Sequence, residues 1–508
     1  MKQDEFRERY FIKLISSVLL AVCNALIQMV LPRVFSVTEY GYYTYNMNVF
    51  TAVVSLANLS CSNALTAKFS KRNEEIGLLT FYLKFYTVMA LVLNAGMMFL
   101  YSFEGIRKAF AGQTLLAVML GLEVCVAVKL LTDSVCVCDA MAVSRFPAAM
   151  QIVLKLILSA AVLAGYLAGR LNLIYFYAVQ CSLTFAFAIF MLMVLIRDQK
   201  RKYPVSIHQG MLHYIREYGQ FCRPLILSEV FSQMIVIWMN WTLMNGSGSS
   251  GQAMFGAAWQ LNTLAGYIFT PYAELLKREF AVVNDQIQDL RKRYVQALKH
   301  MMWITTYLAV FIGAGAEWIL SIAYGDKYAG AAFVTLLMMF YTVYQAWGQV
   351  SGSFLLAMEK TRISACLGIF GQVMNVVCVL IFQMPNFIWE NGLGPVGIAL
   401  TYLVTNVCGV LISVVINSHL LKISCWKNLS IQIAPVLLCS VTAMGLKWGL
   451  DMMYKGTAFI PCMVKTTVAG VLYTLIVMGV IWIHPQFLDL SREGIKNFLT
   501  VHKKTYKF

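Results

Sequence analysis

Long apolar runs follow one another along almost the whole chain, separated by short polar stretches. Each run is about twenty residues long, the length that an α-helix needs to cross the hydrocarbon core of a bilayer. A transmembrane β-strand would instead alternate apolar and polar residues over about ten positions. The pattern therefore predicts an all-α polytopic membrane protein, in which each helix satisfies its own backbone hydrogen bonds.

The runs predict about fourteen transmembrane helices. The first stays in the mature chain, because it is longer than the apolar region of a signal peptide and Pro32-Arg33 follows it instead of a small-residue cleavage site. The predicted spans cover residues 11–31, 42–66, 79–101, 113–131, 147–168, 173–196, 221–244, 252–275, 298–321, 331–356, 364–384, 396–417, 431–450 and 461–483.

Composition supports the same fold class. Of the 508 residues, 59% are hydrophobic and only 13% are charged, whereas globular domains carry roughly 25% charged residues. The chain therefore has too few charges to cover a water-facing surface. Its net charge of +16 does not require a nucleic-acid partner, because anionic lipid attracts basic loops to the inner leaflet.

The Lys and Arg residues orient the spans. With the N-terminus inside, inner segments hold 26 of these residues and outer loops hold 6. Short loops rich in Lys and Arg stay on the cytoplasmic side. We therefore predict a multi-pass protein whose N- and C-termini are both cytoplasmic.

Loop charge and span number predict the domain organisation. A charged inner loop at 197–220 follows six spans, and a duplicated six-helix unit would give two parallel lobes around a central cavity. The predicted divisions are an N-lobe at 1–196 with spans 1–6, a cytoplasmic linker at 197–220, a C-lobe at 221–417 with spans 7–12, and spans 13–14 with a cytoplasmic tail at 418–508.

Polar side chains recur on the first two spans of each predicted lobe. Polar groups inside a bilayer are costly, and they face a cavity or another helix. One interpretation is a shared substrate cavity, and the alternative is that these amides join neighbouring helices by hydrogen bonds. The candidate cavity amides are Asn24, Gln28, Asn58, Gln233, Asn240 and Gln260.

Several cations also lie within spans. Snorkelling to the membrane surface accounts for Lys13, Lys447 and Lys465. Lys129 has a structural explanation in a pair with Asp133, four residues later on the same helix. Lys155 is explained either by a pair with Glu123 on the neighbouring span or by substrate binding.

Arg223 stands directly before Pro224 at the start of the seventh span. A guanidinium matches the oxygens of phosphate, so Arg223 is a candidate phosphate ligand. An ordinary basic anchor at the inner headgroup level is the alternative.

The chain shows no sign of a metal, a cofactor or covalent catalysis. It carries no Walker, zinc or nucleophile-elbow motif, and its 13 cysteines form no disulfide framework. All six histidines lie in inner loops or at the inner ends of predicted spans, so the sequence shows no histidine relay through the membrane. If ion flow drives the protein, buried carboxylates must carry it, and the candidates are Glu229 and Glu123.

Four motifs resemble the polysaccharide exporter branch of the multidrug/oligosaccharidyl-lipid/polysaccharide (MOP) superfamily, which also holds multidrug extruders and the lipid II flippase. They are Leu31-Pro32-Arg33-Val34-Phe35-Ser36-Val37-Thr38-Glu39-Tyr40-Gly41, Tyr218-Gly219-Gln220-Phe221-Cys222-Arg223-Pro224, Phe255-Gly256-Ala257-Ala258-Trp259-Gln260-Leu261, and Tyr324-Gly325-Asp326-Lys327-Tyr328-Ala329-Gly330. The sequence differs from the pattern of many relatives at two places. Asn240-Trp241 replaces the acid and Arg that many relatives carry, and no acid lies between residues 11 and 31.

The resemblance implies a flippase that is not an enzyme. It would move an undecaprenyl-diphosphate-linked oligosaccharide across a bacterial inner membrane for O-antigen, capsule or exopolysaccharide synthesis, with polymerase and other assembly proteins as possible partners. Arg33, Lys84, Lys155 and Arg223 are its candidate diphosphate ligands. An ion-coupled drug antiporter of the same fold is the main alternative. A membrane glycosyltransferase would need acids on a large outer loop, and the predicted outer loops are short.

Overall fold

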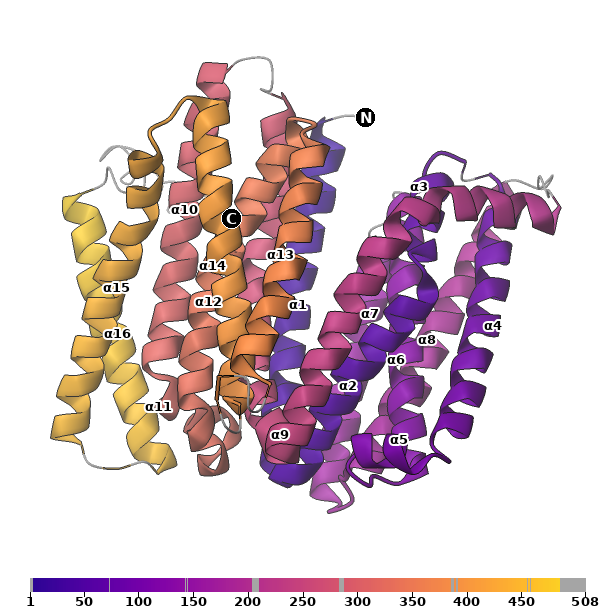
Figure 1. Cartoon of the computed structure of the whole chain (residues 1–508), viewed down its shortest axis with the longest axis horizontal. Coiled ribbons are helices and arrows are strands. Elements are labelled where there is room, and N and C mark those ends of the chain that lie inside the picture. Colours follow the sequence, from indigo (N-terminus) through magenta and orange to yellow (C-terminus); the bar gives the residue numbers. More distant parts are fainter. Residues whose placement is uncertain are drawn as a thin grey trace, which may run out of the picture. The chain divides into compact units, whose positions relative to one another are not determined.

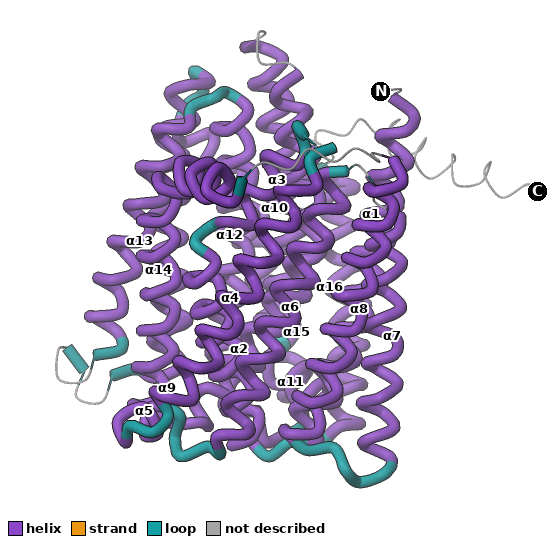
Figure 2. The backbone as a smooth tube through the Cα atoms, turned by 90° about the vertical axis from the view of Figure 1, so that its right-hand side faces the viewer, coloured by secondary structure: helices purple, strands orange, loops and turns teal. Residues whose placement is uncertain are grey.

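The computed structural model describes residues 3–484, except 73, 142, 144, 203–209, 283–286, 385–387, 390–391, 455 and 457. For 3–18, 224, 268, 270–271, 273–275, 277–278, 281–282 and 361 it describes the backbone alone. Within these residues the chain is helical and contains no strand, and short loops join the helices (Figure 2). The predicted all-α polytopic fold class is confirmed.

The fourteen predicted spans fall on helices, but not one to one. In the described residues, ten helices are long and apolar enough to span a membrane, or twelve if each bent pair counts once. The first predicted span lies within one helix, Gln3–Val34, in which the stretch with described side chains, Leu19–Val34, is apolar. The seventh and eighth share one long helix, which Gly248 interrupts with φ of 65° and ψ of −164°.

The helices group into two compact units. Unit 1 is Met1–Gly256 with Gln383–Pro395, and unit 2 is Ala257–Phe382 with Val396–Phe508. The division by residue ranges into lobes and a linker stays a prediction. The helices of unit 1 are α1 (Gln3–Val34), α2 (Val37–Asn58), α3 (Cys61–Phe69), α4 (Ile76–Leu100), α5 (Glu104–Ala109), α6 (Leu115–Ala140), α7 (Arg145–Leu167), α8 (Leu173–Lys202) and the first part of α9 (Met211–Val282).

Unit 2 begins within α9 and contains the C-terminal helices. Its 3-10 helix lies in the fourth resemblance motif, where Gly325 ends a helix in a left-handed conformation with φ of 91°. The elements are α10 (Ile287–Ala314), α11 (Ala316–Tyr324), η1 (Asp326–Ala331), α12 (Ala332–Ala357), α13 (Thr361–Phe382), α14 (Gly394–Leu421), α15 (Cys425–Met453) and α16 (Phe459–Ile483).

Local sequence explains where α2 begins. Ser36 is its N-cap, and the Ser36 hydroxyl accepts a hydrogen bond from the Glu39 backbone N–H at 3.1 Å. The Glu39 carboxylate accepts in turn from the Ser36 backbone N–H at 3.0 Å. This reciprocal pair is a capping box, so the first resemblance motif has a structural role as the turn between α1 and α2.

Two breaks shape unit 1. The second span, predicted as one helix, consists of α2 and α3, whose axes differ by 58°. The first stretch of α9, Met211–Arg223, is bent by 64° from the stretch that begins at Leu225. Figure 1 shows this first stretch lying across the end of unit 1 beside α3, while the spans run lengthwise.

Candidate functional site

Eleven of the twelve predicted site residues belong to unit 1, and Gln260 belongs to unit 2. Two of the eleven, Asn24 and Gln28, lie half-buried one turn apart on α1. The Gln28 side chain hydrogen-bonds the Tyr43 hydroxyl of α2. Its carbonyl oxygen is buried and has no hydrogen-bond partner. Gln28 therefore offers an open acceptor in the interior of this unit.

Lys155 lies half-buried on α7, near the Cys23 thiol of α1. Its sequence-based pair with Glu123 is wrong, because the described residues form no ion pair between the two. They lie on different helices, α7 and α6, and spacing along the chain does not fix how such helices face each other. Lys155 is thus a partly buried ammonium with no carboxylate partner among the residues that the structure describes.

Two other cations inside helices, Lys129 and Lys465, are paired. Lys129 Nζ lies 2.7 Å from Asp133 Oδ1 on α6, as the four-residue spacing predicts. Lys465, assigned to snorkelling from sequence, is only 4% exposed, and its Nζ lies 2.8 Å from Asp451 Oδ1. That assignment is wrong, because the ammonium is held inside unit 2 by a carboxylate of α15. Lys155 differs from these two residues, because its ammonium group has no carboxylate partner among the described residues.

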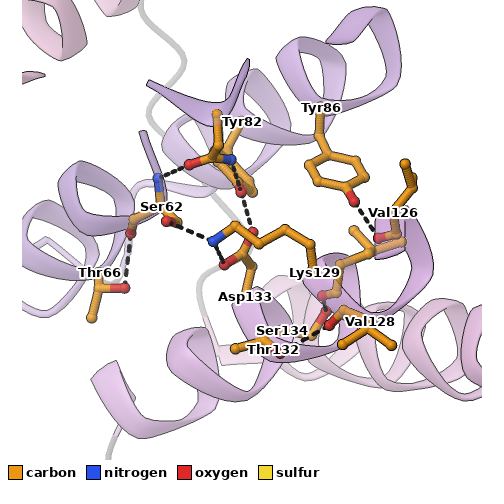
Figure 3. A network of polar contacts seen from close by, with 12 residues as sticks. Ser62, Thr66, Tyr82, Tyr86, Val126, Val128, Lys129, Thr132, Asp133 and Ser134 are labelled. Atoms are coloured by element: carbon orange, nitrogen blue, oxygen red, sulfur yellow. Dashed lines mark hydrogen bonds and ion pairs between the residues drawn. The ribbon is translucent and has the colours of Figure 1, made fainter. Parts of the chain in front are cut away.

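Asn58 belongs to a closed set of contacts. Its Nδ2 donates to the Tyr82 hydroxyl at 2.9 Å, and its Oδ1 accepts from the Ser62 backbone N–H at 3.1 Å. The Tyr82 hydroxyl donates to Asp133, and Lys129 Nζ donates to the Ser62 hydroxyl at 3.0 Å (Figure 3). We call Asn58, Ser62, Tyr82, Lys129 and Asp133 the polar ring.

Asn240 joins α9 to α2 within unit 1. It is 4% exposed, and its Oδ1 accepts a 3.1 Å hydrogen bond from Asn48 of α2. Its Nδ2 donates to the Val236 carbonyl at 2.9 Å. Asn58 and Asn240 thus both make the interhelical bonds of the structural alternative. A role for either in substrate binding stays a prediction.

The two candidate coupling acids differ. Glu229 on α9 is half-buried and accepts a 2.8 Å hydrogen bond from Gln233, so these two site residues lie together. Glu123 on α6 is also half-buried, but it forms no ion pair within the described residues. Ion coupling through either acid stays a prediction.

Three candidate cations lie exposed. Lys84 shares an exposed face of α4 with Val88 and Leu91, which are 59% and 66% exposed. Such a face is typical of contact with lipid, with the ammonium snorkelling. Arg33 ends α1, and Arg223 ends the crosswise stretch of α9. The structure therefore places these three at surfaces of unit 1 and Lys155 in its interior.

Gln260 lies half-buried on α9 in unit 2. Its neighbour in sequence, Trp259, has its ring centroid 5.3 Å from that of Tyr402 and 6.5 Å from that of Tyr341. The three rings come from α9, α12 and α14. Sequence reasoning missed this aromatic cluster, because nothing in the spacing of the three residues relates those helices.

The fold is that of known membrane transporters. No protein-family model and no curated protein matches the chain. Among solved structures, the lipid II flippase MurJ in an inward closed conformation is similar with a TM-score of 0.64 and 14% identity, over 93% of this chain and 99% of that one.

Two transporters of the MOP superfamily match a smaller share of the chain. An inward-facing MATE family transporter of the MOP superfamily has a TM-score of 0.57 at 15% identity, over 80% of this chain and 95% of that one. A MOP superfamily transporter from Pyrococcus furiosus has 0.53 at 13% identity, over 80% and 96%. At such identities the likeness shows the fold alone, a polytopic membrane transporter fold.

Proposed function

We propose that this chain is a flippase that moves a lipid-linked oligosaccharide from the inner to the outer leaflet of a bacterial inner membrane. The carrier would be undecaprenyl diphosphate, and both termini would be cytoplasmic. A sugar headgroup stripped of water would lose about 4 to 8 kcal/mol per unsatisfied hydroxyl in an alkane-like medium. Such a substrate needs polar groups and a cation along its route.

The observation that carries this proposal is Lys155. A cation inside a protein is normally paired, as Lys129 and Lys465 are here. Lys155 has no such partner among the described residues, and Gln28 on the facing helix α1 has an open acceptor. An anionic diphosphate would supply the missing counter-charge, and the amides of α1 would meet sugar hydroxyls.

The comparisons support the proposal in one respect. The similarity to the lipid II flippase extends over 93% of the chain, against 80% for the multidrug transporter of the highest TM-score reported above. The polysaccharide exporter branch itself is part of the proposal, resting on the sequence motifs.

A cation-coupled drug antiporter is the second candidate. Glu123 favours it, because a half-buried carboxylate without an ion-pair partner could hold a cationic substrate or an ion. The two candidates differ in substrate charge. Lys155 would attract a lipid diphosphate and repel a cationic drug.

Charge removal at Lys155 tests the proposal. The protein is placed in vesicles that contain an undecaprenyl-diphosphate oligosaccharide with a fluorescent group on the sugar, and an impermeant quencher reports the leaflet. Lys155→Met should slow flipping roughly tenfold or more, because hydrogen bonds to charged groups contribute about 1.5 to 3 kcal/mol. Lys155→Arg should retain most of the rate.

The matched control is Lys202→Met, which removes an exposed cation that pairs with Asp198 on the surface at 2.7 Å. It should flip the lipid at the normal rate. Normal flipping by Lys155→Met would remove Lys155 from the substrate route. Uptake of a cationic dye, with no flipping of the lipid by the unchanged protein, would favour the antiporter.

A further inference from the structure

The break between α2 and α3 is energetically unusual. Leu59 and Ser60 have φ of 50° and 60°, in the left-handed region that residues with side chains rarely adopt. Strained backbone of this kind persists only where surrounding contacts hold it. The break lies within a membrane-spanning segment, where water cannot satisfy the freed backbone groups.

The polar ring supplies those contacts. Asn58 caps the first turn of α3 by accepting from the Ser62 backbone N–H, and it also donates to Tyr82 of α4. Lys129 of α6 holds the Ser62 hydroxyl. Asp133 closes the ring by accepting from both Lys129 and Tyr82 (Figure 3). Three separate elements thus hold the start of α3.

The Asp133 carboxylate neutralises the positive charge of Lys129 in the polar ring. The Asp133 side chain is 4% exposed and that of Lys129 is 21% exposed. If Asp133 binds a proton, it loses its negative charge and Lys129 loses its counter-ion. An uncompensated buried charge is strongly unfavourable, so Lys129 would move toward water and leave Ser62.

We propose that Asp133 is a proton-binding site whose occupancy controls the break in the second span. A proton from water bonds to a carboxylate oxygen, no other covalent bond changes, and the ring opens. Ser62 then loses its bond to Lys129, and the start of α3 is held less firmly. The inference does not depend on which substrate the protein moves, and it assigns the role to a residue other than Glu229 and Glu123.

Contacts at both ends of α3 would transmit the change. Lys68 Nζ lies 3.1 Å from Glu217 Oε1 on the crosswise stretch of α9, and Arg72 also pairs with Glu217. Cys61, the first residue of α3, is within hydrogen-bonding contact of Cys222 on the same stretch of α9. Displacement of α3 therefore acts on Met211–Arg223, which ends at Arg223.

Other side chains surround Asp133, and the test must distinguish their effect on the pH response from that of Asp133. On α4, Tyr82 and Tyr86 face α6, and Tyr86 donates to the Val126 carbonyl. α8 contributes the apolar side chain of Leu192, which lines a small cavity with Asp133, and α2 and α3 contribute the uncharged Asn58 and Ser62.

Two further ionisable side chains, Glu217 and His213, lie near the far end of α3. Burial alone would raise the pKa of Glu217, but hydrogen bonds from Lys68 and Arg72 hold it below its usual value. Glu217 therefore stays ionised near neutral pH. His213 Nε2 lies 3.7 Å from Glu217 Oε2. His213→Gln is thus the control for this end.

Hydrogen exchange of the intact protein in nanodiscs tests the proposal. The peptide covering residues 59–70 is compared at about pH 8 and about pH 6, after correction for the chemical exchange rate. In the unchanged protein its protection should fall by up to about tenfold per pH unit, as proton-linked opening requires. Asp133→Asn, a neutral side chain of the same shape, should exchange fast at both pH values.

Two further variants complete the test. His213→Gln should keep the full pH response. If Asp133→Asn does not insert, the double change Asp133→Asn with Lys129→Met removes both charges and should give the same pH-independent fast exchange. Equal protection at both pH values in the unchanged protein would overturn the proposal. So would a pH response that survives Asp133→Asn and disappears in His213→Gln.

Discussion

Single residues of the same type have different roles in this chain because their partners differ. The Lys129–Asp133 pair is readable from sequence, since a four-residue spacing places both on one face of a helix. Sequence does not predict that Lys465 pairs with Asp451 or that Lys155 lacks a carboxylate partner among the described residues. Both depend on how separate helices face each other. Sequence thus identifies the candidate ions and the pair within one helix, but not the pairs between helices.

Arg223 yields a prediction at the residue scale. It lies exposed at the end of the crosswise stretch of α9, where a guanidinium can meet phosphate. Because Lys cannot reproduce a bidentate fork, Arg223→Lys should leave the protein inserted and abundant but lower lipid flipping, and Arg223→Ala should lower it further. Flipping is measured in vesicles against protein content. Unchanged rates in both variants would make Arg223 a simple membrane anchor.

Sequence predicts the positions of the helices but not the break in the second span. Apolar run length predicts where helices lie, and the spacing of Ser36 and Glu39 contains the capping signal of α2. The break at Leu59 and Ser60 is not visible in the apolar pattern. No Gly or Pro marks it, and contacts from α4 and α6 hold it in place.

The broken span gives a prediction at the scale of elements. Asn58→Leu keeps a similar volume but removes the cap of α3 and the bond to Tyr82. It should lower the free energy of unfolding by about 1 to 3 kcal/mol, as for buried groups that lose their partners. The change is measured by thermal unfolding in detergent.

The matched control is Asn94→Leu on α4. The Asn94 side chain is half-buried, and among the described residues it bonds only to the Ala90 carbonyl of its own helix, at 2.9 Å. Asn94→Leu should cause a much smaller loss. Equal losses in the two variants would mean that Asn58 has no special role in holding the break.

At the scale of the whole molecule, the all-α polytopic fold follows from the long apolar runs, because each must satisfy its backbone within the bilayer. The grouping of helices into two units does not follow, since the first part of α9 packs with unit 1. A loop-based division separates it, because charge in a loop records the side of the membrane and not the packing partner.

Membrane orientation is a prediction of the whole chain. Lys200 and Ser250 are both exposed, and the Lys and Arg count places them on opposite sides of the membrane. In intact cells, an impermeant maleimide should label Ser250→Cys and reach Lys200→Cys only after lysis, each compared with the unchanged protein. Labelling of Lys200→Cys from outside would reverse the orientation.

The most direct test of the proposed function compares two substrates with the unchanged protein in sealed vesicles. One is a fluorescent undecaprenyl-diphosphate oligosaccharide and the other is a cationic dye, each followed with and without a proton gradient. The account predicts that the protein moves the lipid-linked oligosaccharide between leaflets and does not accumulate the dye. Accumulation of the dye, with the lipid remaining in its original leaflet, would contradict it.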